Sequence, residues 1–211
     1  MKIKVSLIFL IIMYVLQNQL YAQLKFCIHA NCGISTFIEK DNEPQLEIGN
    51  YYTALPSYGF GGDAVYSFKN SKFGIISGLN VSSFASENHL PDHFIIPEYG
   101  WPDKRRNWEE RFYSLSIPLQ LNYKFEEWIH INGGLSNTVH LNKPKDIIFS
   151  KKINQYTLNF IGGIDFVIKQ RVIIGAMYYR DIIPTMLYKN TDDIKYSIEQ
   201  ITVKIGFILT K

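Results

Sequence analysis

The sequence lacks the dense basic clusters that are typical of nucleic-acid-binding proteins. Its formal net charge at pH 7 is only +3, and its longest run of cations is Lys104-Arg105-Arg106. Because a nucleic-acid interface is usually more basic and more clustered, we expect no nucleic-acid partner. The chain also has only two cysteines, which is too few for a disulfide scaffold.

Long apolar runs are equally scarce. Beyond residue 22 no stretch of about 18 apolar residues occurs, so we expect no membrane-spanning helix there. The mean hydropathy of −0.06 does not exclude a transmembrane β-barrel, because barrel strands alternate apolar and polar residues. A hydrophobic content of 46% and an aromatic content of 15% exclude a disordered chain, and 211 residues fit one domain.

The first residues have the layout of a secretory signal peptide. Two lysines within the first four residues precede the mostly apolar segment 5–16, and a small residue follows at Ala22. As a helix this segment spans about 18 Å, which is too short for the hydrocarbon core of a bilayer. We predict a signal peptide over 1–22 that is cleaved after Ala22, and a mature domain over 23–211.

Alternation of apolar and polar residues recurs through the rest of the chain and predicts β-strands. The clearest example runs from Tyr113 to Phe125, where apolar residues take the odd positions and residues such as Ser116 and Gln120 the even ones. Related patterns, some of them weaker, give eight predicted strands. Their ranges are about 24–35, 58–68, 73–81, 113–125, 129–141, 156–169, 172–178 and 200–209.

The connections between these strands alternate between short and long, as the periplasmic turns and external loops of outer-membrane barrels do. We therefore predict an all-β fold, an eight-stranded antiparallel up-and-down transmembrane β-barrel in contact with outer-membrane lipid. Both barrel termini then lie on the periplasmic side. The predicted short connections are 69–72, 126–127 and 169–171, and the long ones are 37–54, 86–110, 142–152 and 182–196.

An exported lipocalin-like barrel is the alternative, with its apolar faces turned inward around an apolar ligand. Two features favour apolar faces that point outward. The polar faces are rich in Gly, Ser, Asn and Thr, which suit a narrow lumen. Aromatic residues also gather near the short turns, as expected for an interfacial girdle. These residues are Tyr66, Phe68, Phe73, Tyr123, Phe125, Trp128 and Phe166.

The best strand also resembles part of a known family. The central signature of the PorT-like outer-membrane β-barrel family is similar to the run Tyr113-Ser114-Leu115-Ser116-Ile117-Pro118-Leu119-Gln120-Leu121-Asn122-Tyr123. Gly133-Gly134 resembles the usual continuation of that signature, and 172–181 resembles the family's penultimate strand. The resemblance covers about 24–210 in layout and implies an eight-stranded, OmpA/OmpX-like barrel. PorT itself is associated with a secretion apparatus.

Five charged residues occupy predicted lumen-facing positions toward the periplasmic end. Buried charges need partners, so we predict that these residues form a salt-bridged plug in the lower lumen. Its role would be structural, because an eight-stranded barrel is too narrow for an aqueous channel. The five residues are Lys25, Asp63, Lys124, Asp165 and Lys204.

The second long connection is the predicted site of contact with a protein partner, because aromatic and arginine residues are favoured in interfaces. Its cations could instead meet lipid phosphates, and packing of the loop on the barrel rim is an equal alternative. The contact residues are Phe94, Tyr99, Trp101, Arg105, Arg106 and Trp108.

Signals for catalysis, cofactors or metals are weak. No Ser–His–acid set falls at one predicted membrane depth, and no Gly-rich phosphate loop occurs. Cys27 and Cys32 lie about 16 Å apart along one predicted strand, so we expect two free thiols. We predict a non-enzymatic protein without cofactor or metal, acting in membrane integrity, adhesion or a secretion assembly, and we leave its oligomeric state open.

Overall fold

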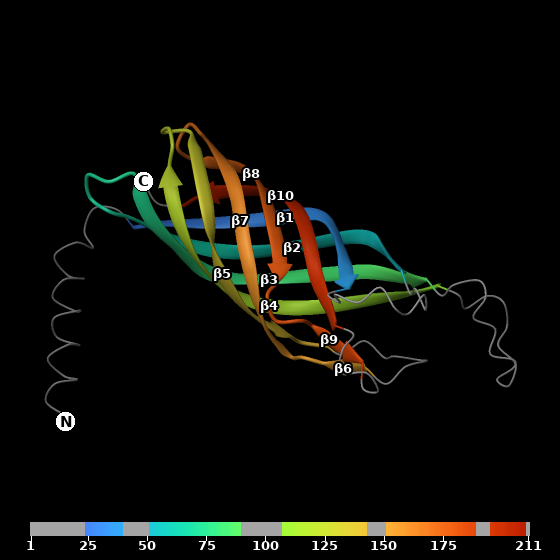
Figure 1. The fold of residues 1–211 in the computed structure, drawn as a ribbon. Helices are drawn as coiled ribbons and strands as arrows, with labels where there is room; N and C mark the ends of the chain where they lie inside the picture. Colours follow the sequence, from blue (N-terminus) through green and yellow to red (C-terminus); the bar gives the residue numbers. More distant parts are fainter. Residues whose placement is uncertain (1–23, 40–50, 90–106, 143–150, 189–194, 210–211) are drawn as a thin grey trace, which may run out of the picture.

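The computed structural model describes residues 24–39, 51–89, 107–142, 151–188 and 195–209, which form ten strands (Figure 1). The predicted signal peptide lies outside the described residues. The strands are β1 (Leu24–Glu39), β2 (Tyr51–Ser67), β3 (Phe73–His89), β4 (Asn107–Lys124), β5 (Ile129–His140), β6 (Lys151–Ile153), β7 (Tyr156–Ile168), β8 (Val172–Asp181), β9 (Met186–Tyr188) and β10 (Lys195–Ile208).

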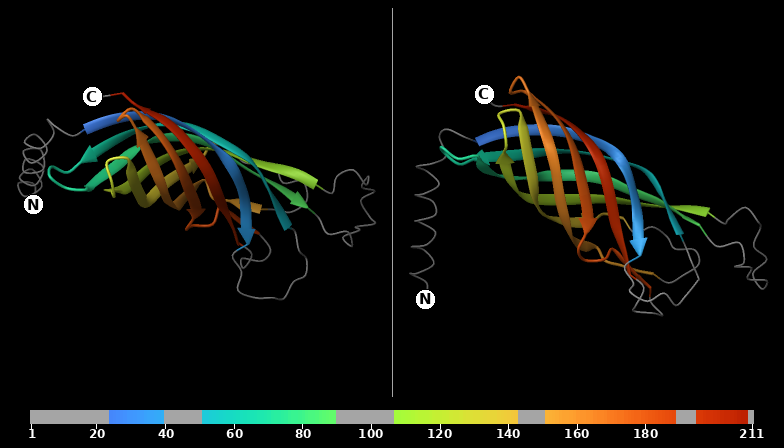
Figure 2. Two further views of the ribbon diagram at one scale, coloured as in Figure 1. Left: turned by 90° about the horizontal axis from the view of Figure 1, so that it is seen from above. Right: turned by 45° about the horizontal axis from the view of Figure 1, so that its top comes forward.

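The eight long strands close into one antiparallel up-and-down barrel. Each pairs with its neighbour in the order β1-β2-β3-β4-β5-β7-β8-β10, and β10 pairs back onto β1. The closing ladder runs from Cys27 opposite Ile208 to Glu39 opposite Tyr196. Figure 2 shows the strands tilted around a common axis, as closure requires. No helix in the described segments is long and apolar enough to cross a membrane.

Side chains alternate between the two faces of the barrel wall as the sequence predicted. On β4, Ile117 and Leu119 are 54% and 62% exposed on the outer face, whereas Gln120 is buried inside. The apolar faces therefore point outward and the polar faces line the lumen. This arrangement contradicts the lipocalin-like alternative, which needs the apolar faces inside.

The three tight turns fall where the sequence predicted them, after β2, β4 and β7. In the turn between β7 and β8, Lys169 and Gln170 both have positive φ, 49° and 56°. Two successive positive φ values are typical of a type I′ hairpin turn, whose twist matches that of the flanking strands. The start of β1 and the end of β10 lie at this same end of the barrel.

The opposite end of the barrel, where the long connections join the strands, is the loop end. Strand lengths at the loop end differ from the prediction. β2 begins at residue 51 rather than 58, β3 continues to 89 rather than 81, and β4 begins at 107 rather than 113. The long connections are therefore shorter than predicted. The connections 142–152 and 182–196 also contain two short strands, β6 and β9, which pair with each other. Three-residue strands carry no readable periodicity, so these two were missed.

A bulge in β2 explains part of this difference. Between Ala54 and Tyr58 the pairing with β3 shifts by one residue, and Pro56 lies within the shift. A bulge reverses the facing of the residues beyond it, and proline there loses no ladder hydrogen bond. The apolar-polar alternation breaks at this point, so the pattern understates the length of β2.

Candidate functional site

The tight turns mark one end of the barrel, the turn end. The lumen at the turn end holds a buried ion pair between β7 and β10. Lys204 Nζ lies 2.7 Å from Asp165 Oδ2, and both side chains are less than a tenth exposed. Asn132 Nδ2 also donates to Asp165 Oδ2, at 2.6 Å. β8 lies between the two strands, and its Gly175 is opposite both Asp165 and Lys204. The missing side chain at Gly175 lets the two charged groups meet, since a Cβ there would lie 2.1 Å from Asp165 Oδ1.

Asp63 forms a second buried pair, with a residue that the predicted plug did not include. Its Oδ2 lies 3.0 Å from His29 Nε2 of β1. A Cβ at the neighbouring Gly78 would lie 2.5 Å from Asp63 Oδ1, so a glycine again makes room for a lumen charge. Period-two alternation places His29 on the inner face, but only the register between β1 and β2 brings it to Asp63.

The two remaining lysines of the predicted plug are placed differently. Lys124 Nζ donates to Ser67 Oγ at 2.8 Å. Lys25 lines the same turn end of the lumen, and neither lysine has a carboxylate within ion-pair distance among the described residues. Among the described residues, the five predicted charges thus separate into the Asp165–Lys204 ion pair, Asp63 in contact with His29, and two lysines without an anionic partner. The stabilising role of the plug stays a prediction.

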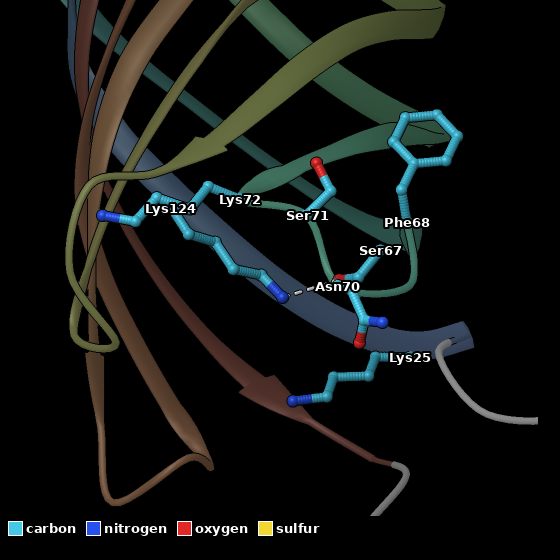
Figure 3. Close-up of a pocket in the computed structure, with 7 residues that line it drawn as sticks. All are labelled: Lys25, Ser67, Phe68, Asn70, Ser71, Lys72 and Lys124. Atoms are coloured by element: carbon cyan, nitrogen blue, oxygen red, sulfur yellow. Dashed lines mark hydrogen bonds between the residues drawn. The ribbon is translucent and has the colours of Figure 1, made fainter.

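Two cavities that share lining residues lie at this end. The inner one, of about 200 Å³, is lined by Lys25 and Lys124 together with Asn122, His130 and Asp165. The outer one, of about 500 Å³, extends from the same two lysines to the turn between β2 and β3. In Figure 3 the ammonium ends of Lys25 and Lys124 point into the space beside Ser67.

A buried hydrogen-bond network lies in the lumen toward the end opposite the tight turns. Ser114 Oγ lies 2.7 Å from His140 Nδ1, and His140 Nε2 lies 3.5 Å from Thr157 Oγ1. Thr157 donates to Asn159, which donates to Asp181 Oδ1 at 2.5 Å. Sequence reasoning missed this Ser–His contact because it depends on the register of β4 with β5. Ser114 and His140 are 0% and 1% exposed. Two residues, Thr157 and Asn159, lie between His140 and the carboxylate of Asp181 in this network.

Asp181 marks the point where β8 leaves the barrel wall. Its carboxylate also accepts hydrogen bonds from the Thr185 hydroxyl and from the backbone N–H of Ile198, the latter at 2.8 Å. Ile198 is the next position along β10 beyond the last β8 pair. The side chain therefore continues the ladder and positions the segment that leads into β9.

An apolar cluster fills the lumen at the end opposite the tight turns. Phe112 is completely buried, and its ring lies edge-on to Phe37 at 5.7 Å between centroids. Met186 reaches the cluster from the short strand β9. The side chains that face the lumen are therefore apolar at this end, whereas the sequence predicted polar ones along the whole lumen. The cluster comprises Phe37, Phe84, Phe112, Met186, Tyr196 and Ile198.

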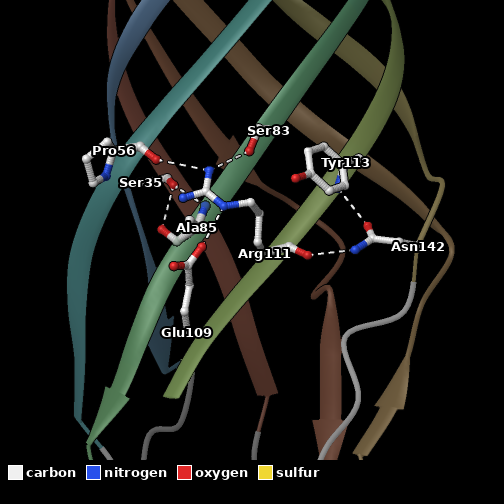
Figure 4. Close-up of polar contacts among 8 residues, drawn as sticks. All are labelled: Ser35, Pro56, Ser83, Ala85, Glu109, Arg111, Tyr113 and Asn142. Carbon is white, nitrogen blue, oxygen red and sulfur yellow. Dashed lines mark hydrogen bonds and ion pairs between the residues drawn. The ribbon is translucent and has the colours of Figure 1, made fainter. Parts of the chain in front are cut away.

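The outer surface near the loop end carries a polar cluster around Arg111 (Figure 4). Arg111 Nε lies 2.6 Å from Glu109 Oε1, and its Nη1 donates to Ser83 Oγ at 2.8 Å. The guanidinium also lies 5.6 Å from the centre of the Tyr58 ring, which fits a cation–π contact. These contacts begin directly beyond Tyr113, where the apolar outer face of β4 ends.

Asn142 closes the free edge of β4 beside this cluster. Its Oδ1 accepts from the Tyr113 backbone N–H and its Nδ2 donates to the Arg111 carbonyl, both at 2.7 Å. The amide thereby imitates the pairing of a neighbouring strand just beyond the end of β5. Edge strands need such protection against pairing with other chains.

The predicted partner-contact residues fall largely outside the described part of the chain. Phe94, Tyr99, Trp101, Arg105 and Arg106 lie outside the described residues. Trp108 belongs to β4 rather than to a loop, and its backbone is opposite Asn88 of β3.

The cysteine prediction is confirmed, because Cys27 and Cys32 are both free. Cys27 is buried in the lumen and Cys32 is exposed on the outer face, as their positions of opposite parity predicted. Within the described ranges, no group of three His, Cys, Asp or Glu side chains is placed to hold a metal ion.

Comparisons with known proteins return structures only. No protein-family model matches the sequence, and no curated protein matches it significantly. The resemblance to the PorT-like family therefore stays a prediction. The outer membrane protein OprG from Pseudomonas aeruginosa is similar with a TM-score of 0.48 at 12% identity, over 88% of this chain and 96% of that chain.

Two further solved structures show the same level of similarity. The attachment invasion locus protein Ail of Yersinia pestis, in complex with sucrose octasulfate, gives a TM-score of 0.41 at 13% identity, over 87% of this chain and 99% of that chain. Neisserial surface protein A gives 0.41 at 12% identity, over 86% and 96%. The assignment of the closed barrel depends on the strand pairing of this chain itself.

Proposed function

We propose that this protein is an integral β-barrel of the bacterial outer membrane with a structural or interaction role and no catalytic activity. The observation that carries the proposal is the continuous apolar belt on the outer face of a closed barrel. Its members include Phe26, Ile28, Ile34, Phe60, Leu79, Ile117, Leu119, Ile131, Leu135, Phe160, Ile164, Ile174, Ile201, Val203 and Ile205, each more than a third exposed.

Such a belt is incompatible with an aqueous environment. Soluble monomers rarely expose contiguous apolar patches larger than a few hundred Å². Here the exposed side chains extend around the barrel, over β1, β2, β3, β4, β5, β7, β8 and β10. Hydrocarbon is the environment that such a surface requires, and a closed barrel satisfies the backbone hydrogen bonds there without a free edge.

The borders of the belt support the same proposal. At the turn end, ring pairs on the outer face include Phe73 with Tyr123 at 5.0 Å and Trp128 with Phe166 at 6.1 Å. Aromatic side chains of this kind lie at the headgroup level of a bilayer. At the other end the belt gives way to the polar cluster around Arg111, which suits a water-facing surface.

Features of the lumen support a role without catalysis or conduction. The Ser114–His140 pair is fully enclosed, so a substrate has no access to it. The cluster around Phe112 fills the loop end of the lumen, which does not suit passage of a solute. The remaining functional surface is the loop end, where β2, β3 and β4 extend beyond the belt. We therefore place the interaction role there, in adhesion or as an accessory to a secretion assembly.

Membrane fractionation of the expressed full-length chain, with mass spectrometry of its N-terminus, tests this proposal. We expect recovery in the outer membrane, resistance to alkaline carbonate, and a mature chain that begins at Gln23. Recovery as a soluble periplasmic protein would overturn it.

A further inference from the structure

Two lysines at the turn end of the lumen, Lys25 and Lys124, have no ion-pair partner among the described residues. Asp165 forms an ion pair with Lys204, and Asp63 Oδ2 lies 3.0 Å from His29 Nε2. Lys25 and Lys124 face the same cavities without a carboxylate partner among the described residues. Two ammonium groups held close together in a partly desolvated space repel each other, and an anion between them removes that repulsion.

The walls of this space offer further donors for an anion. Asn122 is completely buried and lines the inner cavity, and neither atom of its amide has a hydrogen-bond partner in the described part of the chain. His130 lines the same cavity. Glu127 also contributes to the lining, but it is exposed in the turn after β4 and forms no ion pair with either lysine.

The lysine at the rim has a different role. Lys72 lines the outer cavity, but its ammonium group donates to the carbonyl oxygen of Phe125 at 3.1 Å. In Figure 3 this ammonium group lies apart from those of Lys25 and Lys124. The pair of inner lysines therefore defines the positive end of the cavity.

We propose that the turn end of the lumen is a binding site for a small soluble oxyanion, a phosphate or a carboxylate, held between Lys25 and Lys124. Asn122 Nδ2 is the neutral donor at the inner wall. Both lysines occupy lumen-facing positions, so the anion enters through the open turn end rather than from the lipid. The site is separate from the loop end, where the proposed interaction role lies, and it can fail without affecting that proposal.

The first test measures phosphate binding to the full chain in maltoside micelles, at constant ionic strength and low total salt. We expect inorganic phosphate to raise the unfolding temperature of the unmodified protein. The double variant Lys25→Gln/Lys124→Gln should lose at least tenfold in apparent affinity. The control Lys69→Gln removes an exposed lysine from the turn at the same end and should change the affinity less than twofold. Equal affinity in the double variant and the control would overturn the site.

A second pair of variants separates charge from size. Ser67 Oγ accepts from Lys124 and lines both cavities. Ser67→Asp places a carboxylate at this point, so it should raise the unfolding temperature without phosphate and abolish the response to phosphate. Ser67→Asn has the same size without the charge and should retain a response. If Ser67→Asp is less stable than Ser67→Asn and still responds to phosphate, no anion site exists there. This pair decides the question even if the double lysine variant fails to fold.

Discussion

Asp165 and Lys204 lie on strands that are not neighbours, yet their side chains meet at 2.7 Å inside the barrel. They can do so because the residue between them on β8 is Gly175. At this point of the lumen, two charged side chains thus meet over a glycine of the strand that separates them. Gly78 on β3 also leaves room for Asp63, although it does not lie between Asp63 and His29, which are on the adjacent strands β2 and β1.

Gly175→Ala should destabilise the barrel by about 1–3 kcal/mol, because the added methyl group displaces Asp165 from Lys204. Urea unfolding of the protein refolded in micelles gives the free energy. The control is Gly133→Ala on the outer face of β5, where a Cβ would meet no atom of the described residues within 4 Å. Equal effects of the two substitutions would show that the space over Gly175 has no structural importance.

The ion pair itself is tested by a double-mutant cycle. Asp165→Asn or Lys204→Met alone should cost about 3–5 kcal/mol, because each leaves one buried charge without its partner. The double variant should lie much closer to the unmodified protein than the sum of the single changes. Additive losses would contradict a coupled pair, and unchanged stability on neutralising Asp165 would refute the predicted plug.

Phe112→Ala should cost about 3–5 kcal/mol, because the ring is fully buried at the centre of the apolar cluster. Thermal unfolding in micelles measures the loss. Tyr156→Ala is the control, since this side chain is 74% exposed on the outer face at the same end. A loss no larger than that of the control would mean that the cluster does not stabilise the lumen.

The alternation of side chains was the part of this fold that the sequence determined most clearly. Facing, strand order and tight turns depend on local pattern, and all agree with the structure. In contrast, the pairing of Asp63 with His29 depends on the register between β1 and β2, which no local pattern contains. The Ser114–His140 contact was missed for the same reason.

The loop end was predicted least well, for a different physical reason. Ser82 to Ser86 in β3 break the simple alternation, and four of these five residues, from Ser83 on, are buried. Inner side chains there become apolar, as at Phe84, so apolar residues no longer identify the outer face. Strand ends and the short strands β6 and β9 therefore could not be read from the pattern.

The position of a residue within the apolar belt predicts how much an arginine substitution on the outer face of β4 lowers the free energy of unfolding. Leu119→Arg should cost about 2–4 kcal/mol in a bilayer, because it places a cation near the middle of the apolar belt. Phe125→Arg, on the same face but beyond the end of the strand, should cost about 0–1 kcal/mol, as expected near an interface. Unfolding in lipid vesicles measures both, and a reversed order would contradict the proposed position of the membrane.

The lipid-facing orientation of the outer surface is the central claim, and Cys32 provides its most direct test. Cys32 is exposed on the outer face between Tyr58 and Val203, whereas Cys27 is buried in the lumen. A Cys27→Ser variant therefore leaves one thiol for a fluorescent label. After reconstitution into vesicles, we predict quenching by lipids that carry a nitroxide on the acyl chain and little quenching by aqueous iodide. Strong quenching by iodide without quenching by the acyl-chain nitroxide would contradict the membrane barrel.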